Sequence, residues 1–167
     1  MSGDAVLKNS GQAPFVHDEY DSAETNIYGG SFLATDSNGE VSKTSGEAAT
    51  GEGTIADVDS FDPGVDKDED LTSGNVGERI RTQAIPVGGV VEGRLIAGGD
   101  LTSAGNANIS EGDLLVESDK GALAAYDSAE TSGDPEGALY RARESVDNSG
   151  AAAGVSNQAY IEVERIA

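Results

Sequence analysis

Short apolar runs, each broken by a turn, dominate the chain beyond residue 29. The segments 31–35 (SFLAT) and 40–43 (EVSK) flank Asn38 and Gly39, a dipeptide typical of the turn in a β-hairpin. The segments 112–117 (GDLLVE) and 122–126 (ALAAY) flank a second glycine turn in the same way. The pattern therefore predicts two hairpins.

Further strands are predicted by apolar or alternating runs between loop-like stretches. In the last of these runs, Ile161, Val163 and Arg165 alternate with polar or aromatic neighbours at a period of two. Residues 138–146 would also suit a helix, but the turn-like DNSG that follows favours a strand. The predicted strands are 53–58, 79–85, 87–96, 138–146 and 159–166, and the predicted loops are 62–77, 97–109 and 127–136. We expect an all-β fold, a small β-barrel or β-sandwich-like domain with long loops.

Residues 1–28 show no sustained period, which predicts either an extended N-terminal arm that becomes ordered against a partner or a floppy terminus. Residues 29–167 form the predicted β-rich domain. Within it, 31–41 aligns with 113–123, and 53–56 aligns with 137–140. A duplicated hairpin-plus-strand unit would divide the domain into two similar halves, 29–97 and 98–167. Chance recurrence of turn residues is the alternative.

The net charge is −21. So acidic a surface repels nucleic-acid backbones and anionic membranes, which excludes both as partners. Leu, Ile, Val and Phe make up about a fifth of the chain, close to the ~20% line at which a highly charged chain is expected to be disordered. The other interpretation is a fold adapted to concentrated salt, and the presence of only four lysines favours it. There is no cysteine, so disulfides and thiolate zinc sites are excluded.

Candidate chemistry is sparse. Acidic residues between 57 and 70 could hold a hard cation such as Ca²⁺, with Asp62, Asp66, Asp68 and Asp70 as the candidate ligands. The spacing fits a calcium loop poorly, because Leu71 stands where that loop needs glycine, and a solvated acidic loop is the other interpretation. No serine lies in a nucleophile elbow, and His17 is the only histidine. We therefore expect no enzymatic activity and no cofactor.

The six arginines all lie in residues 79–167, whereas the acidic excess is concentrated before them. In a chain that avoids bases, arginines on one strand face indicate pairing with carboxylates, either within the domain or across a subunit boundary. Aromatic residues of the N-terminal segment are further contact candidates. The candidate subunit or shell contacts are Phe15, Tyr20, Tyr28, Arg79, Arg81, Arg141 and Arg143.

An ordered set of parts fills the C-terminal half. An apolar strand is followed by a Gly-Asp-Leu-Leu strand entry, a glycine-turn hairpin, a polar loop and a terminal alternating strand. The segments are 90–96 (VVEGRLI), 107–115 (ANISEGDLL), 121–125 (GALAA), 142–150 (ARESVDNSG) and 160–166 (YIEVERI). Over residues 79–167 this order resembles that of the small capsid-stabilising (decoration or cement) proteins of tailed viruses.

The resemblance implies a virion protein that binds the outside of an icosahedral shell of major capsid protein as a homotrimer. Such a protein would be assembled in the host cytoplasm, and the acidity suggests a haloarchaeal host. The resemblance carries no catalytic residue. The alternatives are another virion or cell-surface structural β-protein, such as a turret, spike, tail-tube or surface-layer component, and an enzyme or calcium-responsive binding module.

Overall fold

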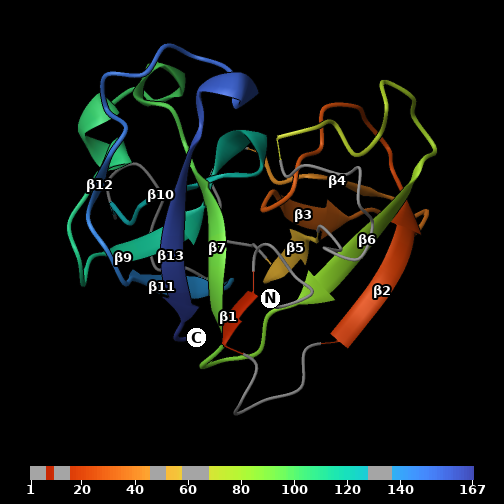
Figure 1. Ribbon diagram of the computed structural model, residues 1–167, viewed down its shortest axis with the longest axis horizontal. Coiled ribbons are helices and arrows are strands. Elements are labelled where there is room, and N and C mark those ends of the chain that lie inside the picture. The colour runs from red at the N-terminus through yellow and green to blue at the C-terminus, as the bar shows by residue number, and fades with distance from the viewer. Residues whose placement is uncertain (1–6, 10–15, 46–51, 58–67, 128–136) are drawn as a thin grey trace.

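The computed structural model describes residues 7–9, 16–45, 52–57, 68–127 and 137–167 and confirms the all-β class. Ten of the strands form two five-stranded groups that lie side by side (Figure 1). The first group, here called the first unit, has the order β2-β6-β5-β3-β4. Its strands are β2 (Val16–Asp21), β3 (Phe32–Thr35), β4 (Val41–Lys43), β5 (Thr54–Ala56) and β6 (Arg79–Ala84).

The second group, the second unit, is a closed barrel. Its strands are β7 (Val90–Leu95), β9 (Leu114–Glu117), β10 (Leu123–Ala125), β11 (Leu139–Ala142) and β13 (Ala159–Arg165). The order is β7-β10-β9-β11-β13, and β13 pairs back onto β7. Closure depends on one parallel pairing, Leu95 with Leu123. In the first unit a single parallel bridge, Ser22 with Val41, joins the two outer strands in the same way.

Both units share one topology and one register. The hairpin β3–β4 pairs Leu33 with Lys43, and the hairpin β9–β10 pairs Leu115 with Ala125, a shift of 82 residues for both partners. The closing bridges correspond as well, because Leu123 lies 82 residues after Val41. These matched pairings indicate a duplicated structural unit.

Hydrogen bonds outside the strand ladders repeat between the units. Gly30 N donates to Ala56 O at 2.9 Å, and Gly112 N donates to Ala142 O at 2.9 Å. The two glycines have φ of 82° and 93°, a conformation that glycine adopts without steric cost. The same backbone turn therefore precedes the hairpin in each unit.

The limits of the units, 16–84 and 90–165, differ from the halves expected from the sequence. β2 occupies in the first unit the place that β7 occupies in the second, since β2 pairs with β6 and β7 pairs with β13. Part of the segment expected to be an arm thus forms a six-residue strand and supplies the buried Ile27. The shift between β5 and β11 is 86 residues rather than 84, because Leu33 pairs with Thr54 and its counterpart Leu115 pairs with Tyr140.

The individual strand predictions agree well with the structure. Residues 138–146 contain β11 and the first residue of the short β12 (Val146–Asp147), with a break at 143–145, which confirms the preference for strand over helix. In β13 the alternation is confirmed, with Ile161 and Val163 buried. The stretch 97–109 is less irregular than expected. It contains the short helices η1 (Gly98–Asp100) and η2 (Ala104–Ala107) and the strand β8 (Asn108–Ile109), which pairs with β12.

Two further features complete the fold. The N-terminal strand β1 (Leu7–Asn9) pairs with β7 of the second unit, although β2, the next strand in the chain, belongs to the first (Figure 1).

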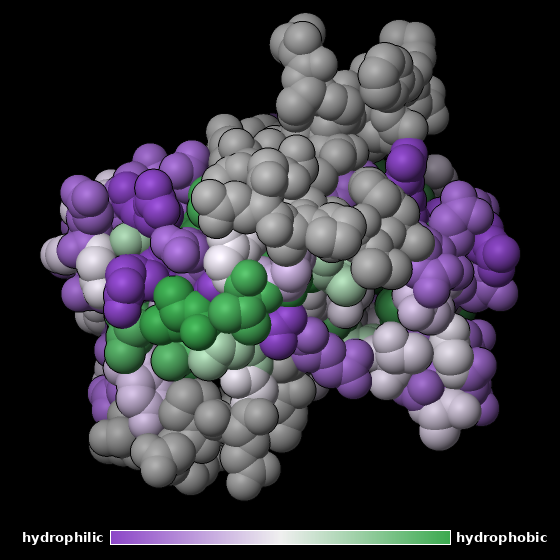
Figure 2. All heavy atoms as spheres, turned by 90° about the horizontal axis from the view of Figure 1, so that it is seen from below, coloured by the Kyte–Doolittle hydropathy of each residue, from purple (hydrophilic) through white to green (hydrophobic). Residues whose placement is uncertain are grey.

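Within the described ranges, no helix has the length and apolar character needed to cross a membrane. Viewed from below, hydrophilic side chains cover much of the visible surface, with an apolar area under the second unit (Figure 2).

Candidate functional site

The contact between the two units is built around Phe32. Its side chain is fully buried and belongs to the core cluster of the second unit, whereas the adjacent Leu33 belongs to the core of the first. The Phe32 ring meets the Tyr140 ring edge to face, with centroids 5.3 Å apart. It lies so close to Gly93 of β7 that a Cβ there would stand 2.6 Å from Phe32 Cε2. Gly93 thus leaves a slot that Phe32 fills.

The first unit has no such slot. The residue of β2 that corresponds to Gly93 is Tyr20, because Tyr20 pairs with Ile80 as Gly93 pairs with Ile161. Tyr20 packs against the core of its own unit. The duplicated units therefore differ at this one position. Glycine in the second unit leaves space for an aromatic ring from the neighbouring unit, and tyrosine in the first unit does not.

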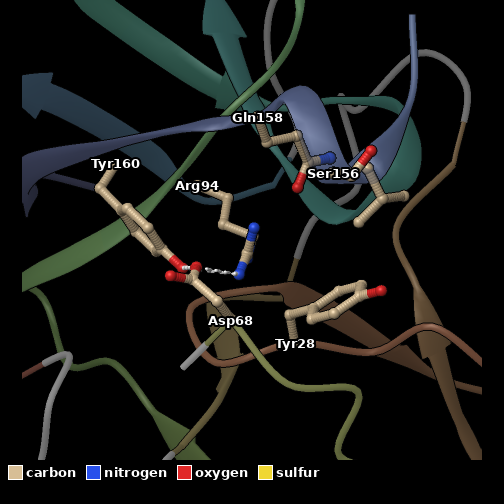
Figure 3. A pocket seen from close by; sticks show the side chains of 7 residues that line it. Tyr28, Asp68, Arg94, Ser156, Gln158 and Tyr160 are labelled. Carbon is tan, nitrogen blue, oxygen red and sulfur yellow. Dashed lines mark hydrogen bonds and ion pairs between the residues drawn. The ribbon is translucent and has the colours of Figure 1, made fainter. Parts of the chain in front are cut away.

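A pocket of about 360 Å³ lies where the units meet, lined by Tyr28 of the first unit, by Asp68, and by residues of the second unit (Figure 3). Arg94, only 3% exposed, points into it between two tyrosine rings. The guanidinium carbon lies 5.0 Å from the centroid of Tyr28 and 4.8 Å from that of Tyr160. Such stacking of a desolvated guanidinium on two rings is attractive. The other lining residues are Val155, Ser156 and Gln158.

Hydrogen bonds hold Arg94 across the junction. Its Nε donates to Gly29 O at 3.0 Å, and its Nη2 donates to the Tyr160 hydroxyl at 2.7 Å and lies 3.7 Å from Asp68 Oδ1. Tyr160 in turn donates to the Asp68 carboxylate. Burial lowers the pKa of Arg94, and the charges of Tyr160, Asp68 and Tyr28 oppose that shift. Because these partners come from both units, the arrangement serves as a structural lock.

Replacing Arg94 with lysine is expected to lower the free energy of unfolding by about 1–3 kcal/mol, because an ammonium group cannot stack on two rings and reach Gly29 O together. Urea unfolding in molar KCl measures the change. The matched control is Arg143→Lys, since Arg143 forms an exposed 3.0 Å pair with Glu164 and its replacement should cost no more than about 0.5 kcal/mol. Equal losses in both variants would contradict the lock.

A second buried polar group, Glu117, also bridges the units. Its Oε2 accepts hydrogen bonds from Gly53 N at 3.1 Å and from the Tyr140 hydroxyl at 3.2 Å. Burial raises the pKa of Glu117 to about 7, against the effect of these hydrogen bonds and of the nearby Arg165, while Glu52 adds to the increase. Burial, with the charge of Glu117, likewise raises the pKa of Tyr140. The junction therefore contains an acid that titrates near neutral pH.

The predicted cation site is only partly described. Asp68 is paired with Arg94, and Asp70 uses both carboxylate oxygens to hold the turn that follows it, accepting from Thr72 Oγ1 at 2.6 Å and from Gly74 N at 3.2 Å. Asp62 and Asp66 lie outside the described residues. In the described part of the chain, no three potential ligands are grouped as a metal ion would require.

Three of the four candidate arginines are paired within the chain. Arg79 lies 3.1 Å from Asp21, Arg81 lies 3.7 Å from the buried Asp57, and Arg143 pairs with Glu164. Arg141 is exposed on β11. Of the aromatic candidates, Tyr20 packs in the first unit, Tyr28 lines the pocket, and Phe15 lies outside the described residues.

The residues that join the units, Phe32, Gly93, Arg94 and Glu117, were not singled out by the sequence. The sequence feature that could have identified them is the glycine at 93, and it stands out only after β2 is aligned with β7, where Tyr20 occupies the equivalent position. No protein-family model matches the chain, and no similar sequence was found among curated proteins.

Proposed function

We propose that the protein is a virion structural protein that binds the outer surface of an icosahedral capsid and stabilises it, acting as a homotrimer. One observation carries the proposal. The stretch 79–167, over which the order of parts resembles that of capsid-stabilising proteins, contains all five strands of the second unit, β7, β9, β10, β11 and β13. The stretch that carries the resemblance therefore includes one complete barrel.

The construction of the chain suits a passive structural role. Two barrels are fixed to each other by a buried aromatic ring, a buried arginine and a buried carboxylate. Such a fixed pair of units is suited to a protein that contacts shell subunits without changing shape.

The acidity supports the expected setting. A net charge of −21 on 167 residues produces strong self-repulsion in dilute buffer. At about 1 M salt the screening length falls to roughly 3 Å, and the repulsion between exposed carboxylates largely disappears. The charge therefore supports the proposal of a salt-rich cytoplasm, as in a haloarchaeal host, as the place of assembly.

The test is the location of the protein in virus particles purified from the host at high salt. We expect it to sediment with the particles in a fixed ratio to the major capsid protein and to be accessible to antibodies on intact particles. Absence from particles would contradict the proposal. Presence only on tails, or only in the cell envelope, would favour a tail-tube or surface-layer component instead.

A further inference from the structure

The first unit covers the second with a defined apolar face. Phe32, Ile55 and Ile85 are each no more than 1% exposed and belong to the core cluster of the second unit. Their strand neighbours Leu33 and Ala56 point the other way, into the core of the first unit. The face therefore lies on the outside of its own unit and is buried only because the second unit packs against it.

The duplication gives each of these residues a counterpart in the second unit. Phe32 pairs with Ile55, and at the equivalent place Leu114 pairs with Arg141. Ile85 N donates to Gly53 O at 2.7 Å, and Ile166 N donates to Leu139 O at 2.8 Å. We call Leu114, Arg141 and Ile166 the outer face.

Unlike its counterpart, the outer face is open. Leu114 is 37% exposed, one of the few large apolar side chains that the described residues expose to this degree, Arg141 is exposed, and Ile166 is half-buried. The underside of the second unit also carries the apolar area seen in Figure 2. Exposed apolar surface rimmed by polar groups commonly marks an interaction site.

We propose that the outer face packs against a second copy of this chain. The counterpart face inside the chain is covered by a barrel of the same topology, so this fold already buries a face at this position against a unit of its own kind. The local charges agree, because Arg141 is an exposed cation that can pair with an acidic group of a neighbouring copy once salt screens the repulsion between the acidic chains. The exposed Asp113 borders the face and can meet Arg141 of a neighbouring copy.

The contact between copies cannot repeat the internal contact. Phe32 needs the slot left by Gly93, whereas the first unit carries Tyr20 at that position. Copies therefore cannot form an open-ended row in which Leu114 of one copy inserts into the first unit of the next copy. The outer faces meet one another in a closed oligomer.

This inference specifies the contact within the homo-oligomer and rests on that part of the proposed function alone. The test is the mass of the full chain in molar KCl, measured by light scattering. We expect an oligomer for the wild type and the monomer mass for Leu114→Asp. The control is Val76→Asp, because Val76 is 63% exposed but belongs to the first unit, and it should keep the wild-type mass.

Arg141→Glu provides a second variant at an exposed position. It should raise the dissociation constant of the oligomer at least tenfold while far-UV circular dichroism stays unchanged. A monomeric wild type would overturn the inference, as would a Leu114→Asp variant that retains the wild-type mass. If neither substitution changes the mass of the oligomer, the outer face is not the contact between copies, whereas the proposal of capsid binding is unaffected. If the protein is absent from virus particles, the proposal of capsid binding is wrong, whereas the inference about the contact between copies is unaffected.

Discussion

Replacing Phe32 with alanine is expected to lower the free energy of unfolding by about 3–5 kcal/mol, the usual cost of removing a fully buried aromatic side chain. The ring is 0% exposed, meets Tyr140 and fills the slot beside Gly93. Its loss would leave a cavity between the units, and neither barrel can close it without moving relative to the other. Urea unfolding in molar KCl measures the loss.

Val76→Ala is the matched control, because the Val76 side chain is 63% exposed and its truncation should change the free energy by less than about 0.5 kcal/mol. A double-mutant cycle isolates the slot. Gly93→Ala should cost about 1–3 kcal/mol in the wild type, since the added Cβ collides with the Phe32 ring. In the Phe32→Ala background that collision is gone, and the cost should largely disappear. Additive losses would contradict the account.

Replacing Glu117 with glutamine is expected to change how stability depends on pH. Folding raises the pKa of Glu117 from 4.5 to about 7, so between these values the folded protein holds a proton that the unfolded chain has released. The stability contributed by this group is therefore highest below pH 4.5, falls as the pH rises to about 7, and stays low above that. The full difference is on the order of 3 kcal/mol.

Glutamine stays neutral throughout, so the free energy of unfolding of Glu117→Gln, relative to wild type, should increase by about 2–3 kcal/mol from pH 4.5 to pH 7.5. Unfolding curves at fixed KCl concentration measure it, and the comparison between variants cancels the other carboxylates. Glu164→Gln is the control, because Glu164 lies on the half-exposed side of β13. A constant difference across this range would show that Glu117 is not the titrating group.

The strands were largely predictable because alternation and turn residues are local signals. The Asn38-Gly39 turn and the alternation of Ile161 with Val163 depend on neighbours within a few residues, and both hairpins form with the predicted partners. Local sequence pattern also revealed the repeated hairpin, because similar strand and turn residues recur after a shift of 82 residues.

The junction was not predictable for a physical reason. Phe32, Gly93 and Glu117 act through contacts between segments that are far apart in the chain, and nothing in their local sequence separates them from ordinary strand residues. The role of β2 was hidden as well, because VHDEYD and VVEGRL share no apolar pattern although they hold equivalent places. The equivalence of β2 and β7 is revealed by the strand register and by the bridges that close each unit, not by similar residues.

The most direct test of the proposed function is a three-dimensional reconstruction of the virion at high salt. We predict density outside the capsid shell into which the paired barrels fit as a rigid body, with several copies meeting around a symmetry axis through the face formed by Leu114, Arg141 and Ile166. A shell whose outer surface carries no such density, in particles proven to contain the protein, would contradict the account.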